Sequence, residues 1–303
     1  MTTDTIVRAQ DVWRQFGRHE ALRGLNLEVP RGSAYALIGA NGAGKTTTIK
    51  VLMNLIGPTR GTATVMGADS RQLPPEILAQ IGYVSESQVL PGRLSVGEYI
   101  EYVRPFYPSW DRELEAAIRS RMQLPPERKI SQLSHGMRLS LGLTCALPYR
   151  PKLLVLDEPF SGLDPLVREE FMEGLLPLIG DLTLFIASQE LDEIENVATH
   201  VGFLHAGRML LEEPLDHLTD RLREVRVTLE QPAVVPDHMP REWVQPRAFG
   251  NVLSFVDTRF SEENLGERLR LLLGPVRAID TQSMPLNTVF KTLARAARDG
   301  AMP

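Results

Sequence analysis

A glycine-rich segment with one lysine carries the clearest chemical signal in the 303-residue sequence. Residues 39–46 read GANGAGKT and fit the phosphate-binding pattern G-x-x-x-x-G-K-[ST], known as a P-loop. An apolar run, SAYALIG, leads into the motif, and TTTIKVLMNLI follows it with apolar residues at helical spacing. Backbone N–H groups of such a loop, together with the helix N-terminus, suit phosphate oxygens. We expect the nucleotide contacts to come from Gly39, Asn41, Gly42, Gly44, Lys45, Thr46 and Thr47.

A nucleoside triphosphate site also needs a metal ligand and a base. Thr46 offers its hydroxyl to Mg²⁺, and Lys45 offers a positive charge to the terminal phosphates. The carboxylates are expected from a neighbouring strand. LLVLDE at 153–158 is an apolar run that predicts such a buried strand. Asp157 at its end would hold the metal, and Glu158 would polarise the attacking water as a general base. ATP and Mg²⁺ are therefore the expected cofactors.

The composition describes an ordinary globular protein, with 43% apolar residues and a formal net charge of −5. Its basic residues form no stripe, so no nucleic-acid partner is expected. The single cysteine, Cys145, lies in the apolar run LGLTCAL and is expected to be buried rather than nucleophilic. The first residues do not resemble a signal peptide, and no window approaches the roughly 18 apolar residues of a membrane span.

Alternating strands and helices predict an α/β fold with a mostly parallel sheet, preceded by antiparallel strands. Residues 94–124 change to a polar-apolar helical pattern and predict a helical subdomain over about residues 86–135. We expect one domain over residues 1–220. Short alternating strands around the helical stretch SEENLGERLRLLLG predict a small α+β domain over residues 221–303.

Further motifs extend the P-loop signal. LSHGM at 133–137 lies shortly before LLVLDE, SGLD at 161–164 follows it, and the apolar run LTLFIAS leads to Gln189. This order resembles the nucleotide-binding domain of ABC transporters over about residues 5–220. The resemblance implies head-to-tail dimers in which Ser134 and Gly136 bind the γ-phosphate held by the other subunit. It also implies a dimer contact at Asp164 and adenine stacking on Phe16.

Four positions depart from the pattern of that family. His135 and Met137 replace a glycine and a glutamine of the usual LSGGQ. Glu86 stands where a glutamine touches the metal and water, with Gln88 nearby as a substitute. Gln189 stands at the position of the switch histidine and retains a hydrogen-bond donor but no titratable proton. A local alternative for Gln189 is that it caps a helix beginning at Glu190.

The resemblance implies a partner as well as a reaction. An ATPase subunit of this family drives a separate membrane permease and sits at the cytoplasmic face of the cell membrane through it. MPLNTVFKTLA at 284–294 resembles the C-terminal end of subunits that serve ABC-2-like export permeases. Tyr99, Tyr102 and Phe106 are expected either to contact the permease or to form the subdomain core. The alternative function is a soluble ABC-type ATPase, or a nucleotide-dependent regulatory switch, without a permease.

Overall fold

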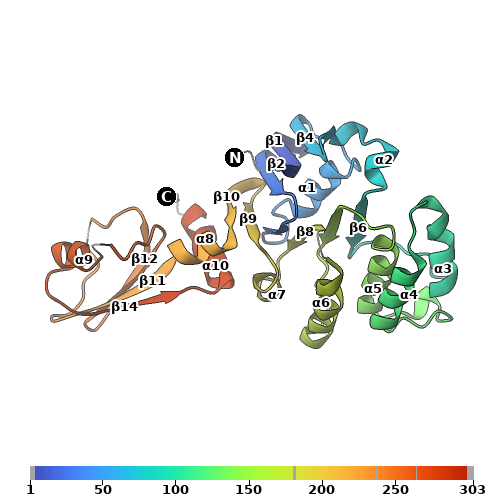
Figure 1. Ribbon diagram of the computed structural model, residues 1–303. Helices are drawn as coiled ribbons and strands as arrows, with labels where there is room; N and C mark the ends of the chain where they lie inside the picture. Colours follow the sequence, from blue (N-terminus) through green and yellow to red (C-terminus); the bar gives the residue numbers. More distant parts are fainter. Residues whose placement is uncertain (1–3, 180–181, 237, 264, 299–303) are drawn as a thin grey trace. The chain divides into compact units, whose positions relative to one another are not determined.

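The computed structural model describes residues 4–179, 182–236, 238–263 and 265–298, and the chain divides into two compact units (Figure 1). The first unit is Met1–Glu212 and the second is Glu213–Pro303. The first unit contains all the candidate site residues. The predicted α/β class, with its antiparallel part, helical subdomain and C-terminal α+β part, is confirmed.

The first unit begins with an antiparallel sheet in the order β2-β1-β4-β5. Its long first hairpin forms because apolar residues alternate along both strands, so that one face is buried. Phe16, at the end of the first strand, pairs with His19 beside the turn. The strands are β1 (Thr5–Phe16), β2 (His19–Pro30), β4 (Arg60–Val65) and β5 (Ala68–Asp69).

The larger sheet has the order β10-β9-β3-β8-β7-β6, and the pairs β9-β3, β3-β8, β8-β7 and β7-β6 are parallel. Parallel pairing brings the carboxyl ends of these strands to one edge. Ile38 pairs with Ser188, and Ser85 pairs with Asp157. The residues that follow these strand ends are therefore neighbours in space. The strands are β3 (Ala34–Ile38), β6 (Ile81–Ser85), β7 (Leu153–Asp157), β8 (Thr183–Ser188), β9 (His200–His205) and β10 (Arg208–Pro214).

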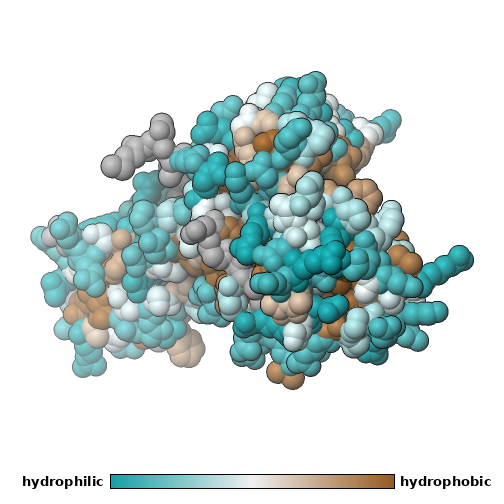
Figure 2. Space-filling model, turned by 45° about the vertical axis from the view of Figure 1, so that its right-hand side comes forward, coloured by the Kyte–Doolittle hydropathy of each residue, from teal (hydrophilic) through white to brown (hydrophobic). Residues whose placement is uncertain are grey.

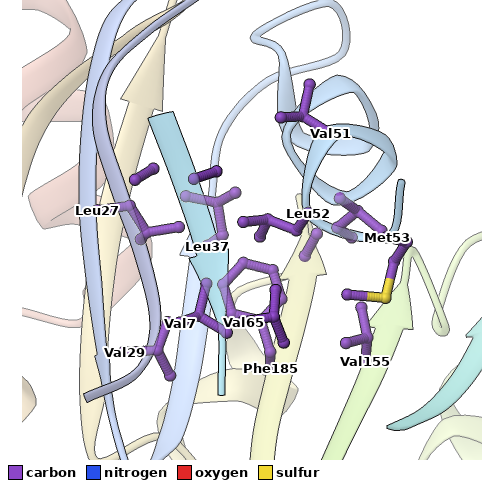
Figure 3. Close-up of a cluster of buried hydrophobic side chains, with 14 of the residues drawn as sticks. Val7, Leu27, Val29, Leu37, Val51, Leu52, Met53, Val65, Val155 and Phe185 are labelled. Atoms are coloured by element: carbon purple, nitrogen blue, oxygen red, sulfur yellow. The ribbon is translucent and has the colours of Figure 1, made fainter. Parts of the chain in front are cut away.

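The core of this unit fills the space between the two sheets and the helix that follows the P-loop. Figure 3 shows Leu37, Leu52, Val65 and Phe185 converging from both sheets and from that helix. Their burial fixes the strand and the helix that flank the P-loop. The helices and 3-10 turns outside the helical subdomain are α1 (Lys45–Leu52), η1 (Ser70–Gln72), α2 (Pro75–Leu78), α6 (Pro165–Ile179) and α7 (Asp192–Glu195).

A helical subdomain lies beside β6 in Figure 1, where α5 packs on that strand. Its first helix starts with a capping box, in which the Ser95 hydroxyl and the Glu98 carboxylate each accept the other's backbone N–H. Cys145 is partly rather than fully buried and packs against the subdomain core, and desolvation raises the pKa of its thiol to about 12, which agrees with a structural rather than a nucleophilic role. The elements are α3 (Val96–Val103), η2 (Arg104–Phe106), α4 (Arg112–Arg121), η3 (Ile130–Gln132) and α5 (His135–Ala146).

The second unit is a four-stranded antiparallel sheet in the order β12-β13-β11-β14, accompanied by helices. Its core includes Trp243 stacked on Phe255, with ring centroids 4.3 Å apart. The elements are α8 (Leu215–Arg221), β11 (Arg223–Leu229), β12 (Trp243–Phe249), β13 (Val252–Asp257), α9 (Leu265–Leu273), β14 (Val276–Ser283) and α10 (Leu286–Arg298).

Candidate functional site

The P-loop joins β3 to α1 and needs glycine for steric reasons. A Cβ at Gly39 would lie 2.5 Å from the carbonyl oxygen of Leu204. Gly44 has φ +114°, and a Cβ there would lie 2.8 Å from the carbonyl oxygen of Ala21. Side chains at these two positions would push the loop away from the sheet edge. The two glycines therefore let the loop backbone pass close to the neighbouring backbone at Leu204 and Ala21.

The N-terminus of α1 lies at the end of the P-loop. Gly44 precedes the helix, none of the described side chains caps it, and its first turn carries no acidic residue. The first N–H groups of a helix have no intrahelical partner and carry partial positive charge. This end of α1 is suited to a phosphate group.

Lys45 is the buried cation of the site, with a side chain only 4% exposed. Its Nζ donates to the carbonyl oxygen of Gly39 at 2.6 Å and forms an ion pair with Glu158 Oε1 at 2.8 Å. A cation held between a carbonyl and a carboxylate has exchangeable anionic partners. Phosphate oxygens can replace the carboxylate without moving the lysine from the loop.

Thr46 and Asp157 form the second pair at the same edge. The Thr46 hydroxyl donates to Asp157 Oδ1 at 2.9 Å. Burial raises the pKa of the Asp157 carboxyl, although the hydrogen bond from Thr46 opposes this rise. A nearby cation would favour the ionised carboxylate. A hydroxyl and a carboxylate side by side are oxygen donors of the kind that Mg²⁺ prefers, so these residues fit that ion.

Glu158 follows β7 with a backbone φ of +53°, an uncommon value for a residue other than glycine. Two backbone hydrogen bonds hold it there. The Glu158 N–H donates to the carbonyl oxygen of Ala187 at 2.8 Å, and the Gln189 N–H donates to Glu158 Oε2 at 3.2 Å. The carboxylate is thus held between Lys45 on one oxygen and Gln189 on the other. Strained backbone of this kind is common at functional sites.

Gln189 is exposed directly after β8, beside Glu158. The idea that it caps a helix from Glu190 is wrong, because α7 begins at Asp192 and Leu191 stands in the cap position. The Glu190 N–H is instead bound by the Ser188 hydroxyl at 2.9 Å. The backbone of this segment is fixed locally, which leaves the Gln189 amide available for another partner.

LSHGM lies at the start of α5. The Ser134 hydroxyl caps the helix by accepting from the Met137 N–H at 3.2 Å. Gly136 is buried, and a Cβ there would lie 2.8 Å from a methyl group of Val167 on α6. Ser134 and Gly136 both line a cavity of about 740 Å³ between α4, α5 and α6. Each has a structural role here, and their contact with a second subunit stays a prediction.

Asp164 precedes α6, and its Oδ1 accepts from the Val167 N–H at 3.1 Å. Phe16 is 45% exposed, and the Arg14 guanidinium lies 4.5 Å from its ring centroid. An exposed aromatic ring next to a cation can stack on a base. The adenine contact at Phe16 stays a prediction.

Glu86 is exposed directly after β6, and its N–H donates to the carbonyl oxygen of Asp157 at 3.1 Å. Within the described ranges, no group of three or more His, Cys, Asp and Glu side chains is arranged to hold a metal ion. Glu86, Asp157 and Glu158 form no such group, and the contact of Glu86 with a metal stays a prediction. The Gln88 Oε1 atom would lie 3.5 Å from a Cβ at Gly142 on α5. Its amide thus lies against α5, the helix that begins in LSHGM.

Two relationships in this site had no signal in the sequence. The ion pair between Lys45 and Glu158 joins residues more than a hundred positions apart. Arg168, on α6, donates to the carboxylate of Glu190 at 2.9 Å. Only the fold brings these partners together.

Several known proteins are similar to this chain. The sequence model of the family described as "ABC transporter" matches residues 22–161. The bacitracin transport ATP-binding protein BcrA of Bacillus licheniformis is 35% identical over 224 residues, which cover 73% of this chain and 73% of that protein. The lantibiotic transport ATP-binding protein SrtF of Streptococcus pyogenes is 32% identical, over 70% of this chain and 92% of that protein.

Solved structures agree with the sequence relatives. An ATP-binding subunit of an ABC transporter superposes with a TM-score of 0.64 and 27% identity, covering 71% of this chain and 92% of that one. The chain therefore belongs to the ABC transporter family, as one of its ATP-binding subunits. ATP hydrolysis is the activity that this family implies, and the resemblance expected from the motifs is confirmed.

Proposed function

We propose that the chain is the Mg²⁺-dependent ATPase subunit of an export transporter, and that two copies close head to tail around ATP. The observation that carries this proposal is the pairing of Lys45 with Glu158 and of Thr46 with Asp157 at one sheet edge. A cation, a metal-binding hydroxyl, a carboxylate and a base are the groups that phosphoryl transfer to water needs. Thr46 and Asp157 would hold Mg²⁺, which neutralises charge on the phosphates when bound.

The Lys45–Glu158 ion pair gives the site a resting state. While Lys45 holds Glu158 Oε1, that oxygen is occupied by the ion pair. Phosphate oxygens bring more negative charge to Lys45 and would displace the carboxylate. Glu158 would then turn to a water molecule, with its other oxygen still held by the Gln189 N–H. ATP binding itself would in this way activate the base.

The second half of each site would come from the partner subunit. The Ser134 hydroxyl accepts one hydrogen bond and still has a proton to donate to a γ-phosphate. The N-terminus of the twelve-residue helix α5 adds its positive end. Asp164 would contact the partner next to the same interface. Two identical head-to-tail contacts in a two-fold dimer would give two composite sites.

The permease would dock on the helical subdomain. Tyr102 and Phe106 are 61% and 66% exposed, and their rings form an edge contact at 5.8 Å. Tyr99 instead packs against the buried cluster of the subdomain. Tyr99 therefore belongs to the subdomain core, and we propose the permease contact for Tyr102 and Phe106. Docking at this aromatic pair would hold the subunit at the cytoplasmic face of the membrane.

The membrane path would belong to the permease. No helix in the described part of the chain is both long and apolar enough to cross a bilayer. On the face shown in Figure 2, hydrophobic residues form separate patches among hydrophilic ones. Relatives named for bacitracin transport, lantibiotic transport and daunorubicin resistance suggest antimicrobial compounds as the cargo class. Export is the direction consistent with resistance.

Steady-state phosphate release from the purified protein tests the proposed activity. We expect hydrolysis with ATP and Mg²⁺ and none when EDTA removes the metal, because Asp157 and Thr46 act through that ion. ATP binding without hydrolysis, in the presence of Mg²⁺, would instead favour a nucleotide-dependent switch.

Gln189 is expected to contribute through its side-chain amide. The Gln189→Ala variant keeps the backbone N–H that holds Glu158, so a loss of rate reports on the amide alone. Loss of a transition-state donor costs roughly 10²–10³ in rate, and a substitute donor such as this amide should account for part of that range. Gln189→His should turn over as fast as the wild type or faster. An alanine variant with the wild-type rate of phosphate release would contradict this role.

A further inference from the structure

Arg168 joins two loops of the proposed site. It lies in the first turn of α6, and its side chain is 17% exposed. Its Nε donates to the carbonyl oxygen of Leu163 at 2.9 Å, and its Nη1 donates to Glu190 Oε2 at 2.9 Å. A guanidinium is planar and holds its donors in fixed directions, so Leu163 and Glu190 are positioned by one rigid group. Leu163 precedes α6, and Glu190 follows β8.

Glu190 transmits this position to the catalytic base. Its backbone N–H donates to the hydroxyl of Ser188, the last residue of β8. Its carboxylate is held by Arg168, so the short segment 188–190 is fixed at both sides. The residue between, Gln189, donates its N–H to Glu158 Oε2 at 3.2 Å. A shift of Glu190 therefore moves the donor that orients Glu158.

The other end of Arg168 reaches the loop that would face the partner subunit. The carbonyl oxygen of Leu163 accepts from its side chain, and that of the neighbouring Asp164 accepts from its backbone N–H at 3.1 Å. In the proposed dimer this loop is at the contact with the second copy. Any displacement of the loop on closure would act directly on the guanidinium.

We infer that Arg168 is a positioning residue that couples the loop 161–164 to Gln189 and Glu158, so that hydrolysis follows dimer closure. This inference rests on the proposed function and adds a regulatory connection to the same site. Glu190 is 32% exposed, and ion pairs at such positions contribute little to stability. Positioning of a catalytic group is more sensitive, since a displacement of about 1 Å can cost about 10²-fold in rate.

The test compares Arg168→Ala, Glu190→Ala and the double variant. We expect kcat to fall by roughly 10- to 100-fold in each single variant, because Glu158 loses its orientation. The affinity for the fluorescent analogue mant-ATP and the melting temperature should change little. The double variant should be no slower than either single variant, since both remove one connection.

Two further variants separate positioning from folding. Arg168→Lys keeps a charge for Glu190 but has no second fixed donor for Leu163, so its kcat should be intermediate. Arg112→Ala, which removes an exposed arginine from α4, should hydrolyse ATP at the wild-type rate. The inference is overturned if Arg168→Ala retains the wild-type kcat, or if the two single effects multiply in the double variant. Equal losses of kcat, mant-ATP affinity and melting temperature would also overturn it. A wild-type protein without ATPase activity would instead refute the proposed function.

Discussion

Replacement of Lys45 by alanine is expected to abolish ATP hydrolysis and to weaken ATP binding strongly. The side chain is 4% exposed and is the cation that holds Glu158 at this edge. A single transition-state donor is worth roughly 10²–10³ in rate, and Lys45 would also bind the ground-state phosphates. Phosphate release and mant-ATP binding measure the two effects separately.

A matched control for this substitution is Lys152→Ala. Lys152 is exposed just before β7, at the opposite end of the strand from Asp157, and its loss changes the net charge equally. The control should retain both binding and hydrolysis. Hydrolysis at the wild-type rate by Lys45→Ala, with normal Lys152→Ala, would remove the basis for the P-loop assignment.

Replacement of Glu158 by glutamine is expected to have an effect of similar size on turnover but not on binding. The amide cannot accept a proton from water, so hydrolysis should stop. It also removes a negative charge beside the phosphates, which should favour the ATP-bound state. The closed dimer should therefore accumulate with Mg²⁺-ATP, and light scattering after size exclusion should report twice the monomer mass.

Lys45→Ala and Glu158→Gln both remove the Lys45–Glu158 ion pair, which makes their comparison informative. If loss of the pair only destabilised the fold, the two variants would behave alike. We expect opposite behaviour toward ATP, with binding lost in the first and retained in the second. Glu195→Gln, at an exposed position on α7, is the control for the change in charge. A Glu158→Gln protein that hydrolyses ATP normally would show that another group is the base.

The elements that position the site were predictable because their signals are local. Gly39 and Gly44 are required by close backbone contacts, and their spacing with Lys45 is visible in the sequence. The apolar runs before Asp157 and Gln189 predicted buried strands, which the structure has as β7 and β8. Parallel pairing then brings the strand ends together. Local motifs and one topological rule were enough for this part.

Other features depend on contacts between distant residues. The strand β12 was not predicted, because Pro246 interrupts its sequence and Gln245 has a φ of +54° within a register shift. The helix expected from Glu190 begins instead at Asp192. The Ser188 hydroxyl and Arg168 hold Glu190 outside that helix, and both contacts depend on the tertiary fold. Sequence patterns alone do not predict such side-chain contacts.

In the proposed dimer, each ATP site is composed of the P-loop of one copy and LSHGM of the other. Mixing two inactive variants tests it. A Lys45→Ala chain lacks a working P-loop, and a Ser134→Arg chain blocks the γ-phosphate contact, so each alone should be inactive. A mixed dimer contains one site with both defects and one site with neither.

Phosphate release from an equimolar mixture is the most direct measurement. Random pairing makes half of the dimers mixed, each with one intact site of two, so the mixture should recover about a quarter of the wild-type rate. A mixture as inactive as its separate components, although the two variants form mixed dimers, would contradict the head-to-tail site.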